Sequence, residues 1–183
     1  MKKINIITLG CSKNTYDSEL LSGGLTKNKF KIVKDPVDAD FVIVNTCGFL
    51  DEARAEGIER ILDIEELRKN KVIESLIVAG CMSERFEEDL RKELKYVDHY
   101  FGSDQSSDII EYLCSETHSQ YDPDFTRLLS TPSHYAYLKI AEGCDNGCSF
   151  CSIPMMRGLQ KSQPIEWNYQ EAERLVKTGV KEI

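Results

Sequence analysis

The sequence predicts an α/β fold in which helices cover both faces of a doubly wound parallel sheet. Short apolar segments alternate with longer segments whose apolar residues recur at helical spacing. This βαβα order favours parallel strands, because parallel neighbours need crossover connections and helices supply them. The FVIV segment at residues 41–44 is apolar throughout, as is typical of a strand buried on both faces.

The elements of the first domain follow from this alternation. The expected strands are the short apolar segments 4–9, 30–33, 41–44 and 76–79. The expected helices are the amphipathic segments at about 15–27, 50–68, 83–94 and 106–113. The longest helix carries Ile58, Ile61, Leu62 and Leu67 on the side that we expect to face the core.

A polar stretch without a clear period separates this domain from a second one. The stretch SETHSQYDPDFTRLLSTPSH contains two prolines and is typical of a linker. We therefore divide the chain into a first domain at residues 1–114, a linker at 115–133 and the beginning of a second domain at 134–183. The expected elements of the second domain are a strand at 135–141, a helix at about 169–178 and the start of another strand at 180–183.

The composition is that of a globular protein without a basic surface. Hydrophobic residues make up 41% of the chain and charged residues 30%, and the formal net charge is -8. Direct nucleic-acid binding is not expected, because phosphate groups attract positive charge; a basic protein partner is weakly favoured. The apolar run at residues 4–9 is shorter than the roughly 7 to 15 apolar residues of an export signal. No segment approaches the roughly 18 apolar residues of a membrane span, so we expect a cytoplasmic protein without membrane contact.

Three of the seven cysteines lie at equivalent positions in the predicted sheet. Cys11, Cys47 and Cys81 each follow the end of a predicted strand, next to a glycine that would let the backbone approach a metal cluster. Since the carboxyl ends of parallel strands meet at one edge, a shared metal site is expected there. The alternative is that all three are buried small hydrophobic residues. Cys114 lies at helical spacing from Ile110 on an apolar face, and we interpret it as a core residue.

The remaining three cysteines form a compact motif. Cys144, Cys148 and Cys151 are spaced C-x-x-x-C-x-x-C after the expected strand at 135–141. A closed zinc site needs four ligands, and His134 precedes the strand rather than following the loop. Three thiolates can hold a 4Fe-4S cubane and leave one iron open to another molecule. The motif therefore predicts an iron–sulfur cluster with an exchangeable fourth ligand.

The segment EGCDNGCSFCSIP resembles the cysteine motif of the radical S-adenosylmethionine (radical SAM) superfamily. The resemblance implies that Cys144, Cys148 and Cys151 hold the catalytic 4Fe-4S cluster and that its open iron binds S-adenosylmethionine. A 5′-deoxyadenosyl radical then removes hydrogen from an unactivated carbon, a reaction for which the cofactor supplies the reactivity. Phe150 matches the aromatic residue that lies near the adenine in this superfamily, and its alternative role is packing within the loop.

Within this superfamily the chain resembles the methylthiotransferases. The resemblance rests on LGCSKNTYDSE, NTCGFLDEA, VAGCMSER and YAYLKIAEGCDNGCSFCSIPMMRG. It implies a flavodoxin- or Rossmann-like first domain in which Cys11, Cys47 and Cys81 hold an auxiliary 4Fe-4S cluster. It also implies that the second domain is the start of a radical SAM (β/α) barrel.

Ser12, Lys13 and Asn14 resemble the branch of the family that modifies ribosomal protein S12. The implied reaction places a methylthio group on the β-carbon of an aspartate of that protein. The implied cofactors are two 4Fe-4S clusters and S-adenosylmethionine, and an external electron donor is a further implied partner. The alternatives are the sister branch that acts on tRNA, a non-catalytic iron–sulfur carrier, and a structural zinc protein.

The chain departs from the family pattern in two respects. Gln163 stands where the family usually has arginine, which removes a fixed charge and a bidentate donor. A complete barrel with its helices needs roughly 200 residues or more, and far fewer follow the expected linker. We therefore expect a fragment that folds its first domain but whose catalysis is impaired when it acts alone.

Overall fold

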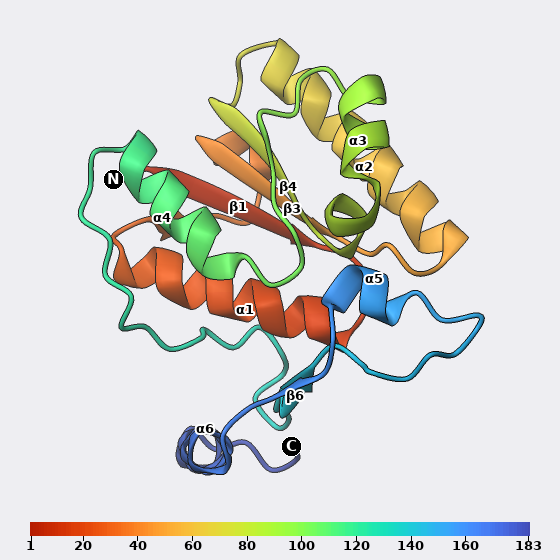
Figure 1. Ribbon diagram of the computed structural model, residues 1–183. Helices are drawn as coiled ribbons and strands as arrows, with labels where there is room; N and C mark the ends of the chain where they lie inside the picture. Colours follow the sequence, from red (N-terminus) through yellow and green to blue (C-terminus); the bar gives the residue numbers. More distant parts are fainter. The chain divides into compact units, whose positions relative to one another are not determined.

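The computed structural model describes residues 1–183, which fall into two units, Met1–Leu128 and Leu129–Ile183. The first unit contains a five-stranded sheet in the order β2-β1-β3-β4-β5, and every neighbouring pair is parallel (Figure 1). Its strands are β1 (Lys3–Thr8), β2 (Lys31–Ile32), β3 (Phe41–Thr46), β4 (Ser75–Gly80) and β5 (His99–Tyr100). Its helices are α1 (Ser12–Lys27), the 3-10 helix η1 (Pro36–Asp38), α2 (Asp51–Lys69), α3 (Cys81–Glu93) and α4 (Ser106–Glu116). The predicted doubly wound parallel sheet is confirmed.

Helices cover both faces of this sheet. Helices α1 and α4 lie on one face, and α2 and α3 lie on the other (Figure 1). Successive side chains of a strand point to opposite faces, so Ile43 packs with α1 and α4 while Val42 and Val44 pack with α2 and α3. Both core clusters therefore draw on β3, and this explains why its apolar segment lacks alternation.

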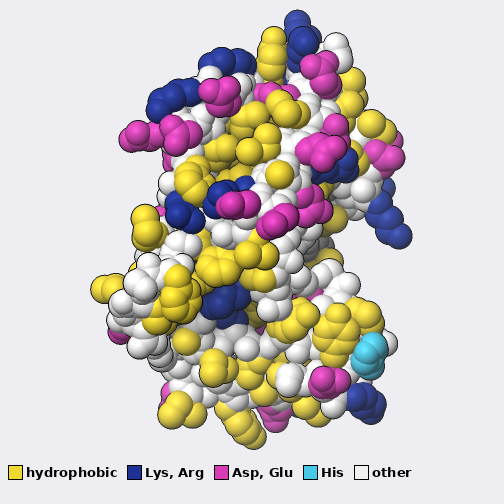
Figure 2. All heavy atoms as spheres, turned by 90° about the vertical axis from the view of Figure 1, so that its right-hand side faces the viewer, with side chains coloured by type: hydrophobic (Ala, Val, Ile, Leu, Met, Phe, Trp, Pro, Cys, Tyr) yellow, Lys and Arg dark blue, Asp and Glu magenta, His cyan; other side chains and the backbone are white.

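The expected apolar side of α2 is partly wrong. Ile61 is buried and Leu67 packs against the core, but Ile58 and Leu62 are 40% and 48% exposed. These two side chains instead line a groove between α2 and α3, visible in Figure 2 as an apolar hollow with a charged rim. Glu65 lies on the buried side because its Oε1 accepts a hydrogen bond of 2.6 Å from the backbone N–H of Tyr96.

Strand β5 was not among the predicted elements. It consists of two residues, which pair with Ile77 and Val78 of β4. So short a strand has no alternation to detect in a sequence, since its pairing with β4 defines it. The 3-10 helix η1 was also not predicted, and the remaining strands and helices of the first unit lie within three residues of the expected bounds.

The first part of the expected linker packs on α1. The side-chain amide of Asn28 donates to Asp122 O (3.0 Å), and its Oδ1 accepts from Asp122 N–H (2.7 Å). Phe125 packs against the core cluster on the same face. The division between the two units, after Leu128, falls inside the expected linker at 115–133. Composition marks this segment as irregular, but its contacts depend on side chains of a distant helix.

The second unit contains short elements. These are β6 (Ala141–Glu142), α5 (Ile153–Arg157), β7 (Lys161–Ser162) and α6 (Ile165–Lys177). Strands β6 and β7 pair antiparallel. The beginning of a barrel stays a prediction.

The continuous strand expected at 135–141 is wrong. Tyr135 forms a parallel bridge with Glu182, whereas Ala141 pairs with β7. The two ends of this apolar segment therefore pair with different neighbours and do not share one hydrogen-bond ladder. The strand expected at 180–183 is reduced to the same bridge, and α6 begins four residues before its expected start, directly after Pro164.

None of the helices combines the length and the apolar character that crossing a membrane requires.

Candidate metal centres

The structure brings Cys11, Cys47 and Cys81 to one edge of the sheet. Cys47 and Cys81 directly follow β3 and β4, and Cys11 follows β1 and precedes α1. The strands that carry them are adjacent. The chain adds β2 on one side of β1 and then β3, β4 and β5 on the other side, so the strand order reverses between β1 and β3. In doubly wound folds, ligands bind at such a switch point, outside the carboxyl ends of the strands.

The three cysteine loops contact one another closely. A Cβ atom built on Gly10 would lie 2.7 Å from Cβ of Cys47 and 3.4 Å from its Sγ. A Cβ atom built on Gly48 would lie 2.5 Å from the carbonyl oxygen of Cys81. We expected the glycines to let a metal cluster approach the backbone. In the structure, the missing side chains of these two glycines instead let the neighbouring cysteine loop pack closely against them.

The three cysteines of these loops lie outside the hydrophobic core clusters. Cys47 and Cys81 are buried but belong to neither of the core clusters on the sheet faces, and Cys11 is exposed. The alternative that all three are buried hydrophobic residues is therefore wrong for Cys11. Cys114 is 1% exposed and packs in the core with Ile110, which confirms it as a core residue.

The donor set suits a cluster better than a single ion. No three Cys, His, Asp or Glu side chains lie close enough together to hold one metal ion. This holds for both cysteine triads as well. A 4Fe-4S cubane instead takes thiolates on different irons, so three thiols from three adjacent loops fit it in type and number.

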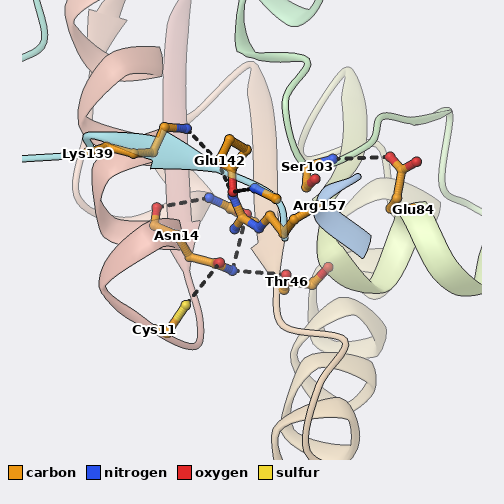
Figure 3. A network of polar contacts seen from close by, with 10 residues as sticks. Cys11, Asn14, Thr46, Glu84, Ser103, Lys139, Glu142 and Arg157 are labelled. Carbon is orange, nitrogen blue, oxygen red and sulfur yellow. Dashed lines mark hydrogen bonds and ion pairs between the residues drawn. The ribbon is translucent and has the colours of Figure 1, made fainter. Parts of the chain in front are cut away.

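A buried polar network lies beneath the cysteine loops (Figure 3). Asn14 is completely buried, and its Nδ2 donates to Leu9 O (2.8 Å) and Thr46 O (2.9 Å). Asn45 Nδ2 donates to Asn14 O (3.1 Å) and to the hydroxyl of Ser18 (3.0 Å). Sequence reasoning used Asn14 only as a marker of the family branch. The signal that it missed was an amide side chain three residues after Cys11, one helical turn into α1.

The second triad lies in the loop between β6 and α5. Cys148 is exposed, and Cys144 and Cys151 are half-buried. The backbone N–H of Cys151 donates to Cys148 O (3.1 Å), and that of Cys144 donates to Gly158 O (3.1 Å). Asn146 Nδ2 donates to Cys144 Sγ at 3.3 Å. One loop therefore carries all three thiols, as the motif predicts.

A buried charge cluster adjoins this loop at both of its ends (Figure 3). Glu142 precedes the cysteine loop, and its Oε2 lies 2.7 Å from Nζ of Lys139 and 3.2 Å from Nη1 of Arg157. All three side chains are at least nine-tenths buried. Two cations therefore share one carboxylate next to the loop that carries the three thiols.

Phe150 is 87% exposed, so its ring packs little against its own loop. Its ring is available to stack on a ligand.

The fold and the site define an α/β protein that carries a three-cysteine edge at its switch point and a separate three-cysteine loop. Residues 3–102 match the model of "Uncharacterized protein family UPF0004", and the chain belongs to this family. The chain is 46% identical over 184 residues to "Ribosomal protein uS12 methylthiotransferase RimO" of Flavobacterium johnsoniae, covering 99% of the chain and 42% of that protein. It is 47% identical to the protein of the same description from Chlorobium phaeobacteroides, covering 100% of the chain and 41% of the relative. The chain thus spans about two fifths of the length of these relatives.

Proposed function

We propose that this protein is a radical SAM methylthiotransferase that modifies an aspartate of ribosomal protein S12 at its β-carbon. The observation that carries the proposal is the pairing, in one chain, of a strand-edge triad and a C-x-x-x-C-x-x-C loop. The likeness to relatives described as uS12 methylthiotransferases supports the substrate.

In this proposal the two triads have different roles. Cys144, Cys148 and Cys151 hold the 4Fe-4S cluster whose open iron binds S-adenosylmethionine, and the exposed ring of Phe150 packs against the adenine. When bound and reduced by an external donor, that cluster supplies the electron that splits S-adenosylmethionine into methionine and the radical that removes the β-hydrogen. The chain's own contribution is to place its three thiols in one loop.

The strand-edge triad serves the sulfur chemistry. Cys11, Cys47 and Cys81 would hold the auxiliary 4Fe-4S cluster, which would supply a binding position for the sulfur that is to be methylated by another S-adenosylmethionine. Burial of Cys47 and Cys81 shields two of the three ligands from solvent and oxidants, while exposed Cys11 leaves the edge accessible to the substrate.

Deletion of the chromosomal gene tests the proposal in the source organism. Mass spectrometry of ribosomal protein S12 is expected to show loss of the methylthio group from its aspartate, while tRNA nucleosides keep theirs. Restoring the gene with Cys11, Cys47 and Cys81 intact should restore the modification, whereas the gene with these three replaced by alanine should not. An unmodified tRNA and an unchanged S12 would assign the protein to the tRNA branch. No change in either would favour an iron–sulfur carrier.

A further inference from the structure

We propose that Asn14 is a positioning residue that fixes the loops of Cys11 and Cys47 relative to each other. This inference rests on the proposed function, because it concerns how the strand-edge triad is held for its cluster.

The amide of Asn14 joins the ends of two strands. Nδ2 carries two hydrogens; it donates to Leu9 O (2.8 Å) and Thr46 O (2.9 Å) and lies farther, at 3.5 Å, from Oδ1 of Asn45. Leu9 lies two residues before Cys11, and Thr46 lies directly before Cys47. One planar group therefore sets the separation of the two chains at the point where each turns toward its cysteine.

The third loop is connected through Thr46. Its hydroxyl donates to Ala79 O at 2.7 Å, two residues before Cys81. Nδ2 of Asn45, in β3, donates to the backbone carbonyl of Asn14, in α1. Hydrogen bonds therefore run from the helix to the strand ends and also from β3 to the helix. A continuous set of hydrogen bonds thus runs from β1 through β3 to β4 beneath all three cysteines.

Only an amide fits this place. Aspartate would set an oxygen against two carbonyl oxygens, and alanine would leave both carbonyls without this donor in a buried site. Oδ1 of Asn14 accepts from the thiol of Cys11 at 3.7 Å. This contact needs the S–H hydrogen, which Cys11 loses when it ligates iron as a thiolate, so the two amide bonds carry the positioning.

Asn28 provides a matched control for the structural contribution of a buried asparagine. It is 6% exposed and caps the opposite end of the same helix. Its Nδ2 also donates to two backbone carbonyls, those of Gly24 (2.9 Å) and Asp122 (3.0 Å). Its replacement therefore breaks comparable bonds at the end of α1 that does not carry a cysteine.

The test uses the full chain with Cys144, Cys148 and Cys151 replaced by alanine, so that iron reports on the first triad alone. Asn14→Ala, Asn14→Ser and Asn28→Ala are made in this background. Each protein is reconstituted anaerobically with iron and sulfide. The rate of iron loss to a chelator, the electron paramagnetic resonance spectrum of the reduced protein and the free energy of unfolding without metal are measured.

We expect Asn14→Ala and Asn28→Ala to lower the free energy of unfolding similarly. Only Asn14→Ala should release iron faster, by about 10- to 100-fold, and shift the spectrum. Asn14→Ser keeps one donor and should lie between Asn14→Ala and the background. Equal iron release and equal spectra for Asn14→Ala and Asn28→Ala would overturn the inference while leaving the proposed function intact. A background chain that takes up no iron would overturn both.

Discussion

At the scale of single residues, Tyr100 shows how burial without a partner changes titration. Its hydroxyl is buried with no hydrogen-bond partner, and the guanidinium of Arg91 lies 4.5 Å from the ring centre. Burial raises the pKa of Tyr100 to about 12 from its usual 10.0, because the charged phenolate is poorly solvated there.

This raised pKa makes stability depend on pH in the alkaline range. The unfolded chain loses the Tyr100 proton near pH 10, whereas the folded chain keeps it until about pH 12. The contribution is therefore complete below pH 10 and is lost as the pH rises to about 12. Urea unfolding between pH 8 and about 12 should show this loss, and Tyr100→Phe should reduce it. Burial also raises the pKa of Tyr112. A separate Tyr112→Phe variant therefore distinguishes the part of the alkaline loss that belongs to Tyr112 from the part that belongs to Tyr100. An unchanged alkaline loss in Tyr100→Phe would contradict the assignment.

Replacement of Gly10 would directly disturb the strand-edge triad. Its φ of +102° is strained for any side chain, and an added Cβ would meet Cys47 at 2.7 Å. We expect Gly10→Ala to lower the free energy of unfolding by about 1 to 3 kcal/mol and to reduce iron uptake by the first triad. Gly57→Ala is a suitable control, because its new methyl group would meet the flexible end of Met82 at 3.2 Å and the Thr46 methyl group at an ordinary contact distance of 3.8 Å. Wild-type stability and iron content in Gly10→Ala would refute the close approach of the two loops.

At the scale of elements, an ion pair fastens the end of the first unit to α1. Nη1 of Arg127 lies 2.8 Å from Oε2 of Glu19, and neither side chain is more than 1% exposed. The guanidinium also lies 4.6 Å from the ring centre of Tyr16, and Leu128 N–H donates to Glu19 O. A buried pair of this kind depends on both of its members, because removal of one leaves the other charge without compensation.

Arg127→Ala should therefore lower the free energy of unfolding of the first unit by about 3 to 5 kcal/mol. Replacing both residues, as Glu19→Gln with Arg127→Met, should cost less than Arg127→Ala because no buried charge is left. Circular dichroism during urea unfolding measures these differences. A loss below about 1 kcal/mol for Arg127→Ala would indicate a surface pair rather than a buried one.

The sequence predicts elements well where their pattern is local. The apolar run in β3 and the amphipathic period of α1 lie within single segments, and both elements were expected close to their observed bounds. Strand β5 and the divided segment 135–141 depend on which neighbour pairs with them, and periodicity carries no such information. In the site, strand-end positions predict the cysteines, whereas the partners of Asn14 become known only when strands distant in sequence lie side by side.

At the scale of the whole molecule, the chain joins two units that each carry one of the two cysteine triads. The two triads differ in construction, since one is assembled from three strand ends and the other lies in one loop. The first triad therefore needs the folded sheet before its thiols converge, while the second needs only a local turn. This difference predicts that denaturant concentrations that unfold the first unit release the iron of Cys11, Cys47 and Cys81 in the same transition.

Iron and acid-labile sulfide per chain after anaerobic reconstitution test the central claim most directly. The proteins compared are the intact chain, the variant with Cys11, Cys47 and Cys81 replaced by alanine, and the variant with Cys144, Cys148 and Cys151 replaced by alanine. The account predicts about eight irons and eight sulfides for the intact chain and about four of each for either variant. Zinc in place of iron, or an iron content that neither set of substitutions lowers, would contradict it.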